Sequence, residues 1–251
     1  MKLNSYKNEI IWIIGASSGI GYALAHELAK RNAILVLSAR SSNDLENLKS
    51  VLGEKHKVFV LDVTDSVMTQ RTAHAIYATF GRIDRVIFFA ATYQPMKLYS
   101  LDLAVSRQIV EVNLLGALHV VKAVLSLPSV HKSIGQIALC GSVAGYAGLS
   151  GGQPYSATKA AIINLAESLY AELFDKIDIK LISPGFVRTR LTDQNDFTMP
   201  MIIKPEDAAK AIAQGLLSKA FEVHFPKHFT MLVKLLRFFP YRVYFWIIRQ
   251  L

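Results

Sequence analysis

Tyr155 and Lys159 stand four residues apart in the segment Gln-Pro-Tyr-Ser-Ala-Thr-Lys, and Ser142 lies thirteen residues before the tyrosine. On a helix, positions i and i+4 share a face, so we expect the ammonium of Lys159 beside the phenol of Tyr155. A nearby cation favours phenolate and lowers a tyrosine pKa from about 10 toward neutral pH. The pair could therefore serve as a general acid and base. The spacing is common by chance, so its meaning depends on the rest of the chain.

The composition indicates a folded chain in a reducing compartment. The 251 residues are 52% hydrophobic and 19% charged, which suits one large domain or two small ones. The one cysteine, Cys140, excludes an internal disulfide, and its apolar surroundings predict a core strand residue rather than a reactive thiol. The apolar run at residues 10–14 is too short for a signal peptide and leads into a glycine turn, so we expect a cytoplasmic location.

The net charge of +9 is concentrated at the C-terminal end of the chain. Residues 227–251 carry five cationic side chains and no acidic one, which leaves +4 for the remainder. The body offers no basic helix with base-reading residues, so we expect no nucleic-acid partner. We also expect no metal site.

Short apolar runs alternate with longer amphipathic stretches along the chain. Strands that are apolar throughout indicate burial on both faces, as in a parallel sheet covered by helices. Repeated strand–helix units predict an α/β fold, a doubly wound, seven-stranded parallel sheet of the Rossmann type. We expect a single domain at 1–226 and a helical, basic extension at 227–251. The predicted strands are 10–14, 33–38, 57–61, 85–90, 136–139, 179–183 and 222–225, and the predicted helices are 19–31, 43–52, 67–80, 101–127, 154–174 and 205–218.

A glycine-rich turn follows the first predicted strand and opens the first predicted helix. Its glycines let the backbone approach a pyrophosphate, while the helix N-terminus supplies N–H groups and a favourable dipole. A simple tight turn is the alternative, but the strand–turn–helix context favours a nucleotide site. The expected contacts in this turn are Gly15, Ser17, Ser18, Gly19, Ile20 and Gly21.

The Gly-x-x-x-Gly-x-Gly spacing, the Tyr-x-x-x-Lys pair and the upstream serine together resemble the short-chain dehydrogenase/reductase family over roughly residues 8 to 225. The resemblance implies interconversion of a carbonyl and an alcohol, with NADP(H) supplying the hydride and Tyr155 the proton. Ser142 would hold the substrate oxygen, Lys159 would also bind the nicotinamide ribose, and Asn113 would support a proton relay through water. Taken singly, these residues have structural alternatives: a strand-end turn for Ser142, a helix kink for Asn113 and a half-buried aromatic for Tyr155.

Arg40 and Ser41 follow the second predicted strand, where an acidic residue would bind the ribose 2′-hydroxyl of NAD. A guanidinium suits a 2′-phosphate instead, so the sequence favours NADP(H) over NAD, the alternative being a solvated loop arginine. Asp62 and Val63 would lie near the adenine by resemblance, although a capping or turn role suits Asp62 equally well.

The turn after the sixth predicted strand would hold the nicotinamide through Pro184, Gly185, Val187 and Thr189, by the same resemblance. Two positions depart from the family pattern. Ile14 replaces the usual threonine before the glycine motif, and Phe88-Phe89-Ala90-Ala91 replaces Asn-Asn-Ala-Gly. Ala90 is still expected beside the cofactor, and the phenylalanines would make the interior drier without touching the reacting groups.

The tail at 228–251 has apolar residues at helical spacing, an interruption at Pro240 and then an aromatic-rich stretch. Its charges are too frequent for a transmembrane span. The pattern favours a helix lying in the membrane interface, at the inner face of a membrane, over an arm packed on its own subunit or on a partner. Together with an apolar lid at 191–204, this favours a lipophilic small-molecule substrate in a cleft lined by Tyr93, Tyr146 and Leu149.

Two other functions stay open. One is a ketoreductase for carrier-bound acyl groups, which would need a basic patch for an acidic carrier. The other is a membrane-associated nucleotide-binding scaffold without catalysis, although a scaffold has no physical need for an activated phenol. The family resemblance also implies a homodimer or homotetramer, paired through helices at 101–127 and 154–174.

Overall fold

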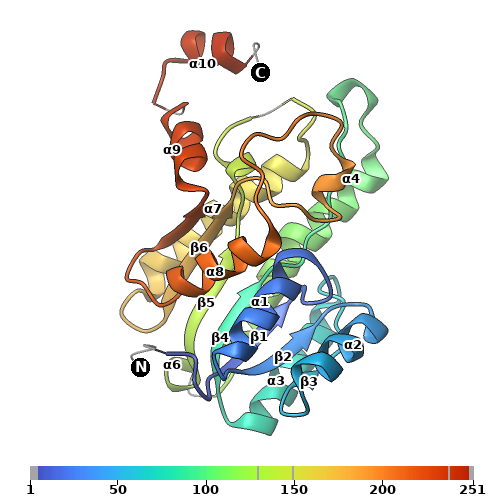
Figure 1. Ribbon diagram of the computed structural model, residues 1–251, viewed down its shortest axis with the longest axis vertical. Coiled ribbons are helices and arrows are strands. Elements are labelled where there is room, and N and C mark those ends of the chain that lie inside the picture. Colours follow the sequence, from blue (N-terminus) through green and yellow to red (C-terminus); the bar gives the residue numbers. More distant parts are fainter. Residues whose placement is uncertain (1–4, 129, 149, 237, 249–251) are drawn as a thin grey trace.

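The computed structural model describes residues 5–128, 130–148, 150–236 and 238–248. Figure 1 shows a central sheet with helices on both of its faces. All neighbouring strands are parallel, in the order β3-β2-β1-β4-β5-β6-β7. This confirms the predicted doubly wound α/β fold. The strands are β1 (Ile10–Ile14), β2 (Ile34–Ser38), β3 (Lys57–Val58), β4 (Ile83–Phe88), β5 (Ile134–Cys140), β6 (Asp178–Pro184) and β7 (Glu222–Phe225).

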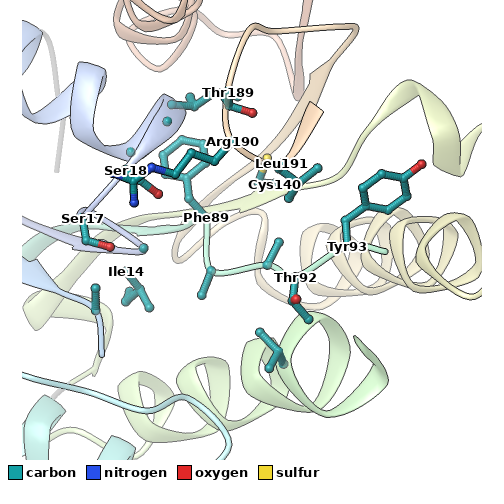
Figure 2. A pocket seen from close by; sticks show the side chains of 18 of the residues that line it. Ile14, Ser17, Ser18, Phe89, Thr92, Tyr93, Cys140, Thr189, Arg190 and Leu191 are labelled. Carbon is teal, nitrogen blue, oxygen red and sulfur yellow. The ribbon is translucent and has the colours of Figure 1, made fainter. Parts of the chain in front are cut away.

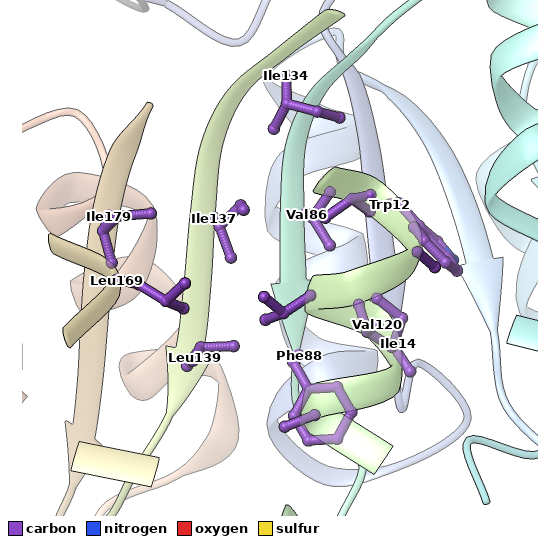
Figure 3. Close-up of a cluster of buried hydrophobic side chains, with 14 of the residues drawn as sticks. Trp12, Ile14, Val86, Phe88, Val120, Ile134, Ile137, Leu139, Leu169 and Ile179 are labelled. Atoms are coloured by element: carbon purple, nitrogen blue, oxygen red, sulfur yellow. The ribbon is translucent and has the colours of Figure 1, made fainter. Parts of the chain in front are cut away.

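Alternate residues of the strands enter two separate apolar cores, because successive side chains of a strand point to opposite faces. Trp12 and Ile14 of β1 join one core, beneath α3 (Ser66–Phe80), α5 (Gly116–Leu125) and α7 (Tyr155–Leu173). Ile11 and Ile13 join the other, beneath α1 (Gly19–Lys30), α2 (Ser42–Leu52) and α8 (Pro205–Gly215). Figure 3 shows the first core, with Val120 and Leu169 packed against the sheet. Burial on both faces explains why the strands read as continuous apolar runs.

The helices follow the predicted pattern with small shifts at their ends. Side chains cap several of them: Ser41 accepts from the backbone N–H of Asp44 at the start of α2, and Asp65 accepts from that of Met68 at α3. The helices of the body, besides α4 and α5, are α1 (Gly19–Lys30), α2 (Ser42–Leu52), α3 (Ser66–Phe80), α6 (Val130–Ser133), α7 (Tyr155–Leu173) and α8 (Pro205–Gly215).

The single helix predicted at 101–127 is in fact two helices joined by a π-helical turn. The helix α4 (Leu103–Val110) runs into the turn Glu111–Leu115, and α5 (Gly116–Leu125) follows. Such turns often mark functional positions, and this one carries Asn113. Within the described residues, the combined stretch Leu103–Leu125 is the one helix long and apolar enough to cross a membrane by length and composition; half of its apolar window is buried in the fold, as in a core helix.

The expectation that the strands are apolar throughout is wrong at their amino ends. Arg85 of β4 is fully buried there and donates to both carboxylate oxygens of Glu9, at 2.7 and 3.2 Å. It also donates to Oε1 of Gln136 (2.7 Å) and to the carbonyl of Leu216 (2.9 Å). Gln136 in turn donates to Asp178 at 2.6 Å. These polar groups satisfy one another, so burying them is tolerated.

The C-terminal extension forms α9 (Lys227–Leu236) and α10 (Tyr241–Ile248), separated near Pro240 as predicted. The ring of Phe229 on α9 lies 5.5 Å from that of Phe186 in the turn after β6. The hydroxyl of Tyr244 on α10 donates to the carbonyl of Gly148 at 2.8 Å. One face of the extension therefore packs on its own subunit, and the division of the chain at residue 226 stays a prediction.

Candidate active site

A cleft of about 490 Å³ opens at the carboxyl ends of the central strands. Its walls come from the turns after β1, β2, β4, β5 and β6 and from the first turn of α7. The chain runs outward in opposite directions from β1 and β4, and ligands of open α/β sheets bind at such a switch point. Figure 2 shows Ser17 and Ser18 of the glycine turn and Thr189, Arg190 and Leu191 of the turn after β6 around the cleft.

The glycine turn brings backbone close to backbone at the floor of this cleft. Gly15 has a φ of +91°, and a Cβ there would lie 2.7 Å from the backbone nitrogen of Ala90. The side chain of Ser18, the N-cap of α1, makes no capping bond, so the first N–H groups of that helix are available to a ligand. Gly15, Ser17, Ser18, Gly19, Ile20 and Gly21 all line the cleft as the sequence predicts. This arrangement fits a pyrophosphate, and therefore a dinucleotide.

Tyr155, Lys159 and Ser142 meet in the same cleft. Tyr155 begins α7, and the ammonium of Lys159, one turn later, lies 5.5 Å from the centre of the tyrosine ring. That ammonium donates to the carbonyl of Cys140 at 2.8 Å. Ser142 follows β5, where its Oγ accepts from the backbone N–H of Ala144 at 3.1 Å. The predicted shared face of Tyr155 and Lys159 is therefore present.

The pKa values of the pair differ from the expectation. Burial raises the pKa of Tyr155 above its ordinary value, and the neighbouring Ser142 hydroxyl only partly offsets this. Burial also lowers the pKa of Lys159, whose charge is directed at the carbonyl of Cys140. The net shift of the Tyr155 pKa is therefore upward, because burial has the largest effect. Tyr155 is a neutral phenol at neutral pH, which is the form that donates a proton.

Cys140, between these groups, ends β5 as a buried core residue and also borders the cleft. Burial raises the pKa of its thiol, because a thiolate would be poorly solvated there. The structure thus agrees with the interpretation of Cys140 as a strand residue.

Asn113 is fully buried beside the cleft rather than exposed in it. Its Oδ1 accepts from the backbone N–H of Thr92 at 2.8 Å, and its Nδ2 donates to the Thr92 carbonyl at 2.9 Å and to Oγ1 of Thr158 at 3.3 Å. The side-chain amide thus fixes the segment that leaves β4 against α7. A role in a proton relay stays a prediction.

The phenylalanines that replace the expected asparagines occupy different positions. Phe88 lies in the apolar core, and Phe89 borders the cleft while its backbone N–H donates to the carbonyl of Ile14 at 2.7 Å. Ala90, next to Phe89, lines the cleft as expected. Because Asn113 holds Thr92, the segment keeps a side-chain anchor even though its own residues are apolar.

Arg40 lines the cleft together with Ser41, Asp62 and Val63. Asp62 accepts from the backbone N–H (3.0 Å) and hydroxyl (2.8 Å) of Thr64, so the turn role considered for it is present. Burial alone would raise the pKa of Asp62, but the bonds from Thr64 and the charge of Arg40 outweigh this and lower it. Arg40 therefore places a cation where the cleft meets the second strand.

The turn after β6 contributes Pro184, Gly185, Val187 and Thr189 to the cleft, as expected. Thr192 stabilises this turn, since its hydroxyl donates to the Val187 carbonyl at 2.7 Å and accepts from the Thr189 N–H at 2.9 Å.

The three predicted substrate-lining residues have different outcomes. Tyr93 lines the cleft, with its ring 4.9 Å from that of Tyr155 and its hydroxyl donating to Asn195 at 2.8 Å. Tyr146 does not: a 3₁₀ turn at Val143–Gly145 directs it toward β7, where its hydroxyl donates to Glu222. Leu149 lies outside the described residues.

Several residues at the cleft escaped the sequence analysis. Arg190 and the residues after it follow Thr189 directly, so continuation of the predicted turn could have identified them. No sequence pattern marks Asp44 or Phe89 as a cleft residue, because their positions at the cleft become evident only when the strands are placed side by side. The additional lining residues include Asp44, Leu61, Phe89, Thr92, Val112, Cys140, Arg190, Leu191, Thr192 and Gln194.

Comparison with known proteins agrees with this geometry. The family model described as short chain dehydrogenase matches residues 9–199. The chain belongs to this family. Short-chain dehydrogenases are oxidoreductases that act on small molecules with a nicotinamide cofactor, so the chain is an oxidoreductase of this family. The structure brings three of the four predicted catalytic residues together around the cleft and places Asn113 directly behind its wall.

Two proteins of similar sequence are an uncharacterized oxidoreductase and a reductase of carrier-bound acyl groups. An uncharacterized oxidoreductase of Myxococcus xanthus is 30% identical over 240 residues, which cover 94% of each chain. The 3-oxoacyl-(acyl-carrier-protein) reductase of Salmonella typhimurium is 32% identical over 189 residues, which cover 75% of this chain and 77% of the relative.

Solved structures show the same fold. A short-chain dehydrogenase/reductase from Burkholderia phymatum, in complex with NAD, superposes with a TM-score of 0.83 at 20% identity and covers 93% of this chain and 94% of its own. A short-chain dehydrogenase from Streptomyces avermitilis gives a TM-score of 0.79 at 22% identity, covering 91% and 92%.

Proposed function

We propose that the protein is an NADP(H)-dependent oxidoreductase that interconverts a carbonyl and an alcohol on a lipophilic small molecule. The observation that carries this proposal is the meeting of Tyr155, Ser142 and Lys159 inside a cleft whose glycine turn fits a dinucleotide. When bound, the cofactor supplies or accepts the hydride. The remaining steps fall to the side chains of the cleft.

Tyr155 is the proton donor during reduction. Its raised pKa keeps the phenol protonated, and the carbonyl oxygen takes the proton as its negative charge develops. The hydroxyl of Ser142 donates a hydrogen bond to the same oxygen and stabilises that charge. Lys159, fixed on the carbonyl of Cys140, holds a buried cation beside the ring and favours the phenolate that remains after transfer.

The preference for NADP(H) rests on Arg40. It is an exposed cation at the end of β2, on the wall where a ribose 2′-phosphate would lie, and Ser41 is beside it. A guanidinium binds phosphate through charge-assisted hydrogen bonds, whereas a ribose hydroxyl offers it no charge. The carboxylate of Asp44 lines the same end of the cleft, so Arg40 must outweigh it.

The aromatic lining supports a lipophilic substrate. Tyr93 and Phe89 border the cleft, and the ring of Phe186, in the turn after β6, lies 5.8 Å from that of Phe197 in the predicted lid. With this substrate class we propose a cytoplasmic enzyme with peripheral membrane contact through 228–251. We also propose a homodimer or homotetramer paired through α4, α5 and α7.

A ketoreductase acting on carrier-bound acyl groups is the second candidate. The carrier-protein reductase of Salmonella typhimurium supports it, with 32% identity over three quarters of this chain. The cations of the C-terminal extension could serve an acidic carrier. Comparing a carrier-bound 3-oxoacyl group with the same acyl group on a small thiol separates the two candidates. A strong preference for the carrier favours the second.

The test is a cofactor-dependent screen of the purified full-length protein. Lipophilic ketones, aldehydes and alcohols are offered with NADPH and NADH in parallel, and absorbance of the reduced cofactor is followed. We expect oxidation of NADPH in preference to NADH with at least one carbonyl. Binding of NADPH without turnover across the panel would contradict the proposal and favour a nucleotide-binding scaffold.

A further inference from the structure

The helix α9 carries apolar side chains on both of its faces. Phe229, Val233 and Leu236 point inward and pack on the body. Met231 and Leu235, one helical turn apart, point outward with 56% and 51% of their surfaces exposed, and Leu232 lies beside them. The inner face explains how the helix docks. The outer face has no counterpart in the body among the described residues.

The helix α10 continues this exposed surface with aromatic side chains. The rings of Tyr241 and Phe245 are stacked, 5.6 Å between centres, and both are more than half exposed. Trp246 is 66% exposed and follows Arg242 by four residues on the same side of the helix. We call Met231, Leu232, Leu235, Tyr241, Phe245 and Trp246 the tail face. Figure 1 shows α9 and α10 at one end of the molecule's long axis, with α10 beyond α9.

Polar contacts hold the tail helices in place on their inner side. Lys234 pairs with Glu222 of β7, and Nδ1 of His224 lies 2.6 Å from Oγ1 of Thr230. Tyr244 is buried and bonded to Gly148. These contacts would keep the tail face turned outward, and nothing in the described body covers it.

The charge around the tail face is cationic. Residues 227–251 carry five cationic side chains and no acidic one. Lys234 is paired with Glu222, whereas Lys227 and Arg242 are exposed. Two copies of this surface would repel each other, so pairing with a second copy of the chain is disfavoured. Exposed tryptophan and tyrosine beside cations suit the headgroup region of a bilayer with anionic lipids.

We infer that the tail face docks on an anionic lipid bilayer. This deepens the proposed function and rests on it for the source of the substrate. The ring of Phe229 contacts the turn after β6, where a Cβ on Gly185 would lie 2.9 Å from it, and Gly185 lines the cleft. A docked bilayer would thus lie beside one wall of the cleft and supply a lipophilic carbonyl from the membrane.

The test is sedimentation of the full chain with vesicles. One set is phosphatidylcholine mixed with phosphatidylglycerol, and the other is phosphatidylcholine alone. We expect binding to the mixed vesicles, weakened by salt, and at least about tenfold weaker binding for Trp246→Glu and for Leu232→Glu. Val51→Glu, at a 69% exposed valine of α2, is the matched control and should bind as the wild type does.

Three further readouts make the result decisive. Circular dichroism confirms that each variant is folded, and sedimentation velocity without vesicles reports its oligomeric state. Equal binding by wild type and both tail variants, or no binding at all, would overturn the inference. Tail variants that change the oligomeric state and not vesicle binding would also overturn it, and would assign the tail face to a contact between copies.

NADPH oxidation with a water-soluble carbonyl tests the proposed function separately. Turnover without vesicle binding refutes only the docking surface. Vesicle binding without turnover refutes only the proposed activity.

Discussion

The two ends of the sheet use polar side chains in opposite ways. At the amino ends, the charged and amide groups of Glu9, Arg85 and Gln136 are turned toward one another in the interior. At the carboxyl ends, Tyr155, Ser142 and Arg40 border an open cleft. Buried polarity satisfied by protein partners stabilises the fold, whereas polarity directed at a cleft is available to a ligand.

Two buried cations, Arg85 at the amino ends and Lys159 at the carboxyl ends, show this difference. Arg85 and Lys159 are both buried, yet Arg85 donates to Glu9, Gln136 and the Leu216 carbonyl, while Lys159 donates to the Cys140 carbonyl and borders the cleft. Substitutions at the amino ends should therefore change stability, and substitutions at the carboxyl ends should change turnover.

The largest effect is expected for Arg85→Met. It leaves Glu9 and Gln136 buried without their partner, which should cost about 3 to 5 kcal/mol of unfolding free energy. Turnover per folded molecule should be unchanged. Urea unfolding and steady-state rates check both statements. Arg71→Met, at an exposed arginine of α3, is the control and should cost less than about 1 kcal/mol. Equal losses of unfolding free energy for the two arginines would contradict the claim that the amino-end network stabilises the fold more than the control arginine does.

Ser142→Ala should lower kcat roughly 100-fold to 1,000-fold, because one hydrogen bond to the developing oxyanion is lost. Its melting temperature should remain close to that of the wild type. The control is Ser156→Ala: the hydroxyl of Ser156 is buried in α7 next to Tyr155 without a hydrogen-bond partner in the described structure, so its removal should leave the rate unchanged. Similar rates for both serine variants would exclude Ser142 from the chemistry.

Arg40→Ala should raise the KM for NADPH about tenfold or more and leave that for NADH unchanged, because a charged hydrogen bond to phosphate contributes about 1.5 to 3 kcal/mol. Arg190→Ala, in the turn after β6, is the control, and any effect there should be alike for the two cofactors. Initial rates with each cofactor give both values. An Arg40 variant that still prefers NADPH as strongly as the wild type would refute the assigned preference.

The smallest effect concerns the carboxylate that anchors the tail. Burial alone would raise the pKa of Glu222, but its bonds with Lys234 and Tyr146 lower it overall. This carboxylate therefore stabilises the fold above its ordinary pKa, and the contribution is lost as the pH falls through the lowered value. Glu222→Gln should cost about 1 kcal/mol at neutral pH and progressively less in acid.

Thermal unfolding over a pH series measures this difference. Glu167→Gln, at an exposed position of α7, is the control and should show no such trend. A Glu222 variant whose destabilisation grew toward acid pH would contradict the assigned sign.

The sequence predicts much of the site at the carboxyl ends of the strands. It predicts little of the polar network at their amino ends. The glycine turn and the Tyr155–Lys159 spacing depend on local geometry, which a short segment specifies by itself. Arg85 and Gln136 look like interruptions of apolar strands until the sheet brings them together across 51 residues.

Tyr146 shows the same limit near the cleft. The sequence predicts Tyr146 as a cleft-lining residue, but a 3₁₀ turn and the distant Glu222 determine where it points. The pKa of Tyr155 was predicted in the wrong direction because its spacing to Lys159 says nothing of burial, which has the larger effect. Local spacing thus predicts which groups are neighbours, and packing decides how they ionise.

The central claim is that Tyr155 transfers the proton, and comparing Tyr155→Phe with Tyr146→Phe tests it most directly. Both tyrosines follow Ser142 in the sequence, at positions four and thirteen residues after it, but only Tyr155 lines the cleft. Rates of NADPH oxidation are measured with a carbonyl that the wild type reduces. We predict a loss of roughly 100-fold to 10,000-fold for Tyr155→Phe and a change of no more than a few-fold per folded molecule for Tyr146→Phe. Full activity in the Tyr155 variant, or equal losses in both, would contradict the account.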